Sequence, residues 1–275
     1  MESKGAPTGL SQGQEFRFEV AEGETVSIKL LGGMAELFGA EMAPARQYQF
    51  VGPTHEAIFT WHGCSLQVEG ACRHSYVASE TPMQSYMHLH ADLEQQRAAA
   101  RQRDGDGPRV LVAGGHGCGK ASLCRMLANW ASRAGGAPVL VELGLSHGRV
   151  GLPGAVAATS VGWPLDIERG TDDAAPLAYW TGHASAEDDP ALYKQRVAKL
   201  AEGVARRLKA HPVTTMLCIY YICPQWKIPW GPFAAPQRRD SERWAGGTLD
   251  IHCKTASLAT WLVSPFGLVR ILLGQ

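Results

Sequence analysis

The segment Gly114–Ala121 has the residue types and spacing of a phosphate-binding loop. It reads Gly-Gly-His-Gly-Cys-Gly-Lys-Ala, which matches the pattern G-x-x-x-x-G-K. A glycine-rich turn of this kind points backbone N–H groups at an anion, and the start of the next helix adds positive potential. We therefore predict a nucleotide site in which Lys120 reaches the β- and γ-phosphates. Its expected binding residues are Gly114, Gly117, Cys118, Gly119, Lys120, Ala121 and Ser122.

The residue after the lysine makes catalysis a separate question from binding. Most loops of this type have Ser or Thr there, whose hydroxyl binds Mg²⁺. Ala121 has no oxygen to offer, so we expect Mg²⁺ to be bound weakly if it is bound. An ordinary β–α connection is the simpler alternative to a nucleotide site, but the Gly-Lys pair between a strand and a helix favours nucleotide binding.

The flanking residues predict the elements that would position this loop. Arg109–Ala113 is an apolar run typical of a buried strand, and residues 122–134 have the apolar spacing of a helix. Further strands are expected at Val139–Leu143 and Thr215–Tyr221, with an amphipathic helix over Leu192–Leu208. This alternation predicts an α/β domain with a P-loop NTPase-type parallel sheet. The basic face of the last helix is either solvated or in contact with RNA.

The first third of the chain has a different pattern. Short alternating segments separated by turn residues predict a small antiparallel β-sandwich or barrel, followed by a helix over residues 83–103. Trp61 and His62 are placed in one of these strands, where core packing is the simpler interpretation. The expected organisation is a disordered N-terminus (1–13), a β domain (14–100), a P-loop kinase-like domain (107–226) and a tail of unknown fold (227–275).

Composition narrows the class of protein. The 275 residues carry 26 basic and 26 acidic side chains, so a globally basic nucleic-acid binder is not indicated. The seven cysteines form no C-x-x-C pair and their number is odd, which suits reduced thiols in the cytosol or nucleus. Residues 1–10 are polar and do not resemble a secretory signal, and no apolar stretch of about 20 residues predicts a membrane span.

Several strings along residues 14–226 are similar to one known family. They include Gly33–Gly39 (GMAELFG), Phe59–Cys64 (FTWHGC), the phosphate loop, and Val141–Leu143 with Leu152–Gly154. The first two are much more specific than the phosphate loop. On these residues the chain resembles the eukaryotic Clp-type polynucleotide 5′-hydroxyl kinases of pre-mRNA cleavage factor II.

The resemblance implies more than the residues alone do. ATP would lie between the first two domains, with Glu15 at the adenine edge and His55 as a second contact on the base or ribose side. Trp226 would stack on a terminal RNA base. The family works in the nucleus, in the cleavage and polyadenylation of pre-mRNA, bound to a scaffold subunit of the cleavage factor. Some members also accompany the tRNA splicing endonuclease.

The chain departs from the family pattern where the chemistry occurs. Active members carry an Asp after the second strand, in a D-x-x-Q pattern, and this chain has Gly144 and His147 instead. That Asp can activate the attacking hydroxyl and help to position Mg²⁺. Around Trp226 the Thr and Gly of the family's T-x-G-W clamp are absent. We therefore predict weak or no kinase activity and no catalytic residue, while ATP binding survives.

Three hypotheses follow. In the preferred one the chain is a degenerate kinase that binds ATP as a structural ligand and acts as a scaffold. In the second it is an active RNA kinase, with Ser122 or Asp172 and Asp173 replacing the missing groups. In the third, the change of character after Trp226 marks a truncated or mistranslated version of a longer protein.

Overall fold

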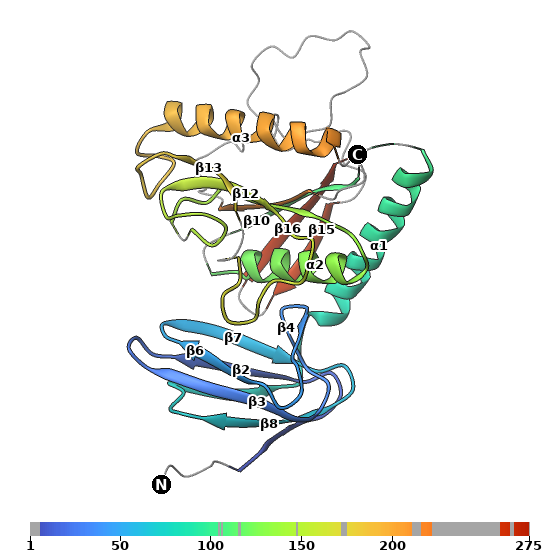
Figure 1. Cartoon of the computed structure of the whole chain (residues 1–275), viewed down its shortest axis with the longest axis vertical. Coiled ribbons are helices and arrows are strands. Elements are labelled where there is room, and N and C mark those ends of the chain that lie inside the picture. The colour runs from blue at the N-terminus through green and yellow to red at the C-terminus, as the bar shows by residue number, and fades with distance from the viewer. Residues whose placement is uncertain are drawn as a thin grey trace.

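The computed structural model describes most of the chain. The described residues are 6–103, 105, 107–114, 117–146, 148–171, 175–210, 216–221, 259–264 and 267–274. They form a β-sandwich and an α/β domain, stacked along the long axis of the molecule with helix α1 (Met83–Gln102) beside the α/β domain (Figure 1).

The N-terminal domain is a sandwich of two antiparallel sheets, as predicted. One sheet has the order β1-β8-β3-β6, and the other has the order β5-β4-β7-β2-β9. The strands are β1 (Thr8–Leu10), β2 (Glu15–Val20), β3 (Thr25–Gly33), β4 (Glu36–Leu37), β5 (Ala40–Glu41), β6 (Gln47–Val51), β7 (Thr54–Phe59), β8 (Cys64–Glu69) and β9 (His74–Ala78). Alternation along β2 places Phe16, Phe18 and Val20 in the sandwich core. Its other residues therefore lie on the outer face.

Two sequence-based expectations for this domain are wrong. Residues 8–10, expected to be disordered, pair with β8 as strand β1, because Leu10 can be buried in the sandwich core. Residues 1–5 lie outside the described residues. Trp61 and His62 were expected in a strand, but β7 ends at Phe59 and both residues lie in a bend. There the Thr60 hydroxyl accepts the backbone N–H of Gly63 at 2.9 Å, which holds the chain in a turn.

The α/β domain has a parallel centre flanked by antiparallel strands. β10 (Arg109–Gly114), β14 (Met216–Tyr221) and β11 (Val139–Glu142) run parallel. The full order is β13-β12-β11-β14-β10-β16-β15, where the added strands are β12 (Ala155–Ser160), β13 (Leu177–Trp180), β15 (Ala259–Ser264) and β16 (Gly267–Gly274). The predicted parallel sheet is thus the centre of a mixed sheet. Two strands within the tail of unassigned fold lie in it.

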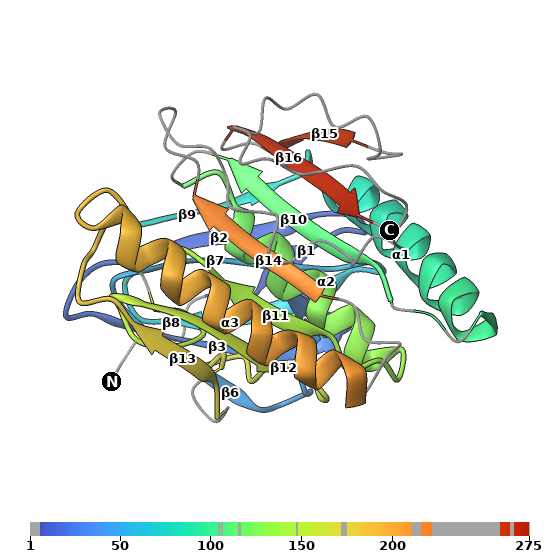
Figure 2. The same cartoon turned by 90° about the horizontal axis from the view of Figure 1, so that it is seen from above.

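Helices cover both faces of this sheet. α2 (Lys120–Arg133) lies on the face toward the sandwich and α3 (Pro190–Ala210) on the opposite face, as Figures 1 and 2 show. The alternation in β10 accounts for both layers. Val110 and Val112 pack in the cluster that contains α2, whereas Leu111 and Ala113 pack in the cluster that contains α3.

The two domains meet closely at Gly39, which has a φ of +80°. A Cβ added there would lie 2.9 Å from the Met126 carbonyl oxygen in α2. Gly23 has the same φ, but its added Cβ would meet nothing within 4 Å. We expect Gly39→Ala to lower the free energy of unfolding by about 1–3 kcal/mol and Gly23→Ala by less, because only Gly39 adds a clash to the backbone strain. Urea unfolding tests this, and equal midpoints for the two variants would contradict the close approach.

Candidate nucleotide-binding site

The phosphate loop joins the end of β10 to the start of α2. Gly117 and Gly119 have φ values of +69° and +83°, a conformation that L side chains rarely adopt. Gly119 is the N-cap residue of α2, and no side chain caps its first N–H groups. Residues 115 and 116 lie outside the described part. Glycine is therefore the residue best suited to these two backbone conformations. The uncapped N–H groups at the start of α2 can bind an anion.

Lys120 is the first residue of α2 and is only 9% exposed. Its Nζ lies 3.8 Å from the Sγ of Cys118. Burial lowers the pKa of Lys120 below its ordinary value of 10.5, and the neighbouring Cys118 and Cys124 partly offset this. A buried ammonium gains from a compact anionic partner, because burial has removed much of its hydration. A phosphate at the start of α2 would be such a partner.

The groups that would hold Mg²⁺ are missing from the described residues. Ala121 has no oxygen, and its methyl group packs against the core cluster beneath α2. Gly144 has no carboxylate, and a Cβ added there would meet nothing within 4 Å. Ser122 is half-buried in the first turn of α2. Among the described residues no group of three or more His, Cys, Asp or Glu side chains could hold a metal ion. The described part of the site thus suits a nucleotide phosphate, and Ala121 and Gly144 add no side-chain oxygen to it.

The carboxylate nearest to Gly144 along the chain belongs to Glu142, which is engaged in a contact of the fold. It is buried at the end of β11, and its Oε2 accepts the backbone N–H of Val150 at 2.8 Å. Burial raises the pKa of Glu142 above its ordinary value of 4.5. Its role in the structure is to hold the loop that follows β11.

This pKa shift predicts how stability depends on pH. The Glu142 carboxyl binds its proton more tightly in the folded state than in the unfolded state. Protonation of Glu142 therefore contributes to the free energy of unfolding in full below the unfolded-state pKa. This contribution is lost as pH rises through the raised pKa of the folded state. Glu142→Gln keeps an acceptor for Val150 and cannot ionise. We expect variant and wild type to match near about pH 4, and the variant to melt at a higher temperature near about pH 7. A difference in Tm that does not change with pH would contradict this.

Glu15 lies on the outer face of the five-stranded sheet, which turns toward α2. It pairs across the sheet with Phe59, which packs in the same cluster as Cys118 and Leu123. Glu15 is only 6% exposed, although it lies on the outer face of the sandwich. Burial raises the pKa of its carboxyl, and the bonded Arg17 guanidinium partly offsets this.

Tyr86 of α1 connects Glu15 to the phosphate loop. Burial raises the pKa of Tyr86 to about 12, and the negative charges of Glu15 and Cys118 contribute. Tyr86 packs in the same core cluster as Cys118 of the phosphate loop and Phe59, the cross-strand partner of Glu15. The structure therefore brings Glu15 and the phosphate loop to the same region, from different domains.

Sequence reasoning missed both neighbours of Glu15. Arg17 follows it by two positions on β2, so strand alternation alone would place the two on one face. Its guanidinium also lies 5.8 Å from the centre of the Tyr76 ring. No comparable pattern could identify Tyr86, because its position depends on how α1 packs against the sandwich.

His55 shares this face with Glu15 but lies farther along it. His55 pairs with Glu19, and Phe59 pairs with Glu15, so the two positions are four residues apart along β7. Four residues of strand span about 13 Å. His55 is exposed, and its predicted contact with the base or ribose stays a prediction. The predictions for Trp226, His147, Asp172 and Asp173 fall outside the described residues.

A groove lies away from the phosphate loop. It has a volume of about 510 Å³ and is lined by residues at the other end of α2, among them Glu36, Trp61 and Trp130. The phosphate loop and this groove are therefore separate features.

No described helix combines the length and apolar character that a bilayer crossing needs.

Comparison with known proteins identifies both domains. Residues 9–100 match the model of the N-terminal beta-sandwich domain of polyadenylation factor, and residues 114–219 match that of the mRNA cleavage and polyadenylation factor CLP1 P-loop. The polyribonucleotide 5′-hydroxyl-kinase Clp1 of Bos taurus is 39% identical over 202 residues, which are 74% of this chain and 48% of that protein. The Homo sapiens protein of the same name is 38% identical over the same shares.

Solved structures agree on the fold. A complex of Clp1p with Pcf11p has a TM-score of 0.70 at 20% identity, covering 80% of this chain and 56% of that one. A second structure of that complex has a TM-score of 0.69. The chain spans about half the length of the relatives that it matches. Taken together, the two matched domains and these relatives show that the chain belongs to the Clp1 family of mRNA cleavage and polyadenylation factors.

Proposed function

We propose that this chain is an ATP-binding subunit of the nuclear machinery that cleaves and polyadenylates pre-mRNA, and that its RNA kinase site is degenerate. The observation that carries the proposal is the composition of the phosphate site. Lys120 and the uncapped start of α2 are present, whereas Ala121 and Gly144 supply no oxygen. The described residues supply groups that suit a nucleotide phosphate, and the missing oxygens at these two positions support a degenerate site.

ATP would act as a ligand between the two domains. Its phosphates would lie at the start of α2, and its adenine would reach the face of the sandwich where Glu15 is buried. The Glu15 carboxylate can accept a hydrogen bond from an exocyclic amino group, which burial would strengthen. A molecule that contacts both domains stabilises their docked arrangement, because it binds only that arrangement tightly.

The proposed protein partner is inferred from solved structures of relatives, because this structure contains a single chain. Clp1p has been solved in complex with Pcf11p. We propose that this chain binds a scaffold subunit of the same kind, and that it contributes shape and contacts to the cleavage factor instead of turnover. Contacts with RNA through Trp226, and with the tRNA splicing endonuclease, are further parts of the proposal that rest on family resemblance.

An active polynucleotide 5′-hydroxyl kinase is the second candidate. Relatives at 38–39% identity carry that name, and Ser122 offers a hydroxyl one position after Ala121. The helix rotates by about 100° per residue, so Ser122 does not simply occupy the position of its neighbour. This rotation favours the degenerate site.

Labelling of RNA 5′ ends separates the two candidates. Purified wild type and Lys120→Ala are incubated with labelled ATP, Mg²⁺ and 5′-hydroxyl RNA. The degenerate site predicts equal background labelling for both proteins. Robust labelling by wild type that Lys120→Ala abolishes would establish the kinase and overturn the proposal.

A further inference from the structure

The far end of α2 rests on residues 36–41 of the sandwich, which we name the α2 seat. Glu36 lies at its centre and is 3% exposed. Its carboxylate accepts the indole N–H of Trp130 at 3.2 Å and a guanidinium N–H of Arg133 at 3.1 Å. Arg133 also donates to the Gly39 carbonyl at 3.2 Å. These contacts tie a strand of one domain to the helix that begins the phosphate site of the other.

The register of the sheet links the seat to Glu15. Glu36 pairs with Phe59 on β7, and Phe59 pairs with Glu15 on β2. The two residues therefore share one face and one row, with their backbones two strand spacings or about 10 Å apart. Trp130 lies ten residues after Lys120, or about 15 Å along the helix. Helix α2 thus extends from the row that contains both carboxylates to the phosphate loop.

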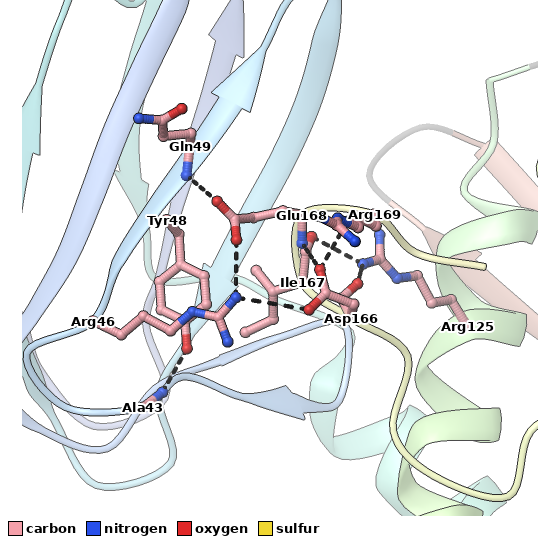
Figure 3. A network of polar contacts seen from close by, with 9 residues as sticks. All are labelled: Ala43, Arg46, Tyr48, Gln49, Arg125, Asp166, Ile167, Glu168 and Arg169. Carbon is pink, nitrogen blue, oxygen red and sulfur yellow. Dashed lines mark hydrogen bonds and ion pairs between the residues drawn. The ribbon is translucent and has the colours of Figure 1, made fainter. Parts of the chain in front are cut away.

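A second contact holds the same part of α2, one residue before Trp130. The fully buried Asn129 donates to the Phe38 carbonyl at 2.7 Å and accepts the Leu165 N–H at 2.8 Å. The loop that follows Leu165 reaches back to the sandwich, as Figure 3 shows. Glu168 accepts the Gln49 N–H at 2.7 Å and pairs with Arg46 at 2.9 Å.

The same loop is fixed to α2. Arg125 donates to the carbonyls of Asp166 and Ile167 at 3.0 and 3.2 Å, and Ile167 is buried in the sandwich core (Figure 3). Helix α2 is therefore held at its middle and at its end, and its first residue, Lys120, lies at the proposed binding site for the ATP phosphates. A helix held in this way cannot shift along the sheet without breaking several contacts.

We infer that Glu36 is a positioning residue for ATP: it seats α2 on the row that carries Glu15, so that Lys120 and Glu15 bind the two ends of one nucleotide. The inference rests on the proposed ATP site. It also accounts for the string Gly33–Gly39, which the phosphate site does not use. That string supplies the carboxylate of Glu36, the carbonyl of Phe38 and the glycine that lets α2 approach.

Two ligands separate positioning from general stability. Inorganic triphosphate can engage only the phosphate loop, whereas ATP also reaches the sandwich. We expect Glu36→Ala to weaken ATP binding about tenfold, the value of one hydrogen bond to a charged group. Triphosphate affinity should not change. Calorimetry measures both, on protein whose folding is checked by circular dichroism.

Matched variants sharpen the test. Glu36→Gln keeps an acceptor for the Trp130 indole and should restore most of the ATP affinity. Glu69→Ala removes a carboxylate from the other sheet of the sandwich and should change neither affinity. In a Glu15→Ala background, Glu36→Ala should have no further effect on ATP, because the contact that it positions is already lost.

Two results would overturn the inference: equal losses of ATP and triphosphate affinity in Glu36→Ala, or full additivity with Glu15→Ala. A wild type that binds neither ligand would contradict the proposed ATP site itself. Hydrogen exchange then still tests the seat. Faster exchange over residues 120–133 in Glu36→Ala than in wild type would support the seating of α2, and unchanged exchange would refute it.

Discussion

Restoring the two missing oxygens is expected to convert this protein into an RNA 5′-hydroxyl kinase. The double variant Ala121→Ser with Gly144→Asp regains a hydroxyl for Mg²⁺ and a carboxylate that can activate the attacking RNA hydroxyl. Loss of a general base alone typically costs roughly 100- to 10,000-fold in rate. We therefore expect the double variant to phosphorylate RNA at least about 100-fold faster than wild type.

The structure can accept both changes. A Cβ added to Gly144 meets nothing within 4 Å, and φ at Gly144 is not in the left-handed region. Serine adds one oxygen to Ala121, which is only partly buried. Each single variant should give a smaller gain, and Lys120→Ala in the double background should remove it. A stable double variant that binds ATP and remains at background would contradict the assignment of these two positions.

Lys120→Ala is expected to lose most of the ATP affinity of the chain. The buried ammonium is the principal charge that the described phosphate site offers, and hydrogen bonds to charged groups contribute about 1.5–3 kcal/mol. The expected loss is therefore about 10- to 100-fold. Calorimetric titration with ATP measures it directly.

A lysine elsewhere provides the control for this variant. Lys199 is exposed on α3, on the opposite face of the sheet, so Lys199→Ala should leave the ATP affinity unchanged. Equal affinities of wild type and Lys120→Ala would place the nucleotide, if one binds, away from this loop.

Local pattern was enough to predict much of the fold. The short alternating segments predicted a β-sandwich that is observed, and the strand and helix predicted around Lys120 correspond to β10 and α2 within two residues at each end. The two-residue strands β4 and β5 were missed, because a strand of two residues has no measurable period. Their existence depends on pairing with β7.

Long-range features of the site were beyond local pattern. The phosphate loop and the positions of Ala121 and Gly144 can be found from sequence. The burial of Glu15 cannot, because it depends on packing by residues distant in the sequence, such as Tyr86. The same holds for Glu36, whose partners Trp130 and Arg133 lie more than 90 positions away. The antiparallel strands that flank the parallel centre also arise from distant pairings.

The most direct test of this account is calorimetric titration of the wild-type chain with ATP, with and without Mg²⁺. We expect a single site whose affinity for ATP changes little when Mg²⁺ is removed, because the proposed phosphate contacts come from Lys120 and backbone N–H groups rather than from a metal. The absence of ATP binding in a folded sample would contradict it. So would affinity that depends strongly on Mg²⁺, since the described residues offer that ion no ligand set.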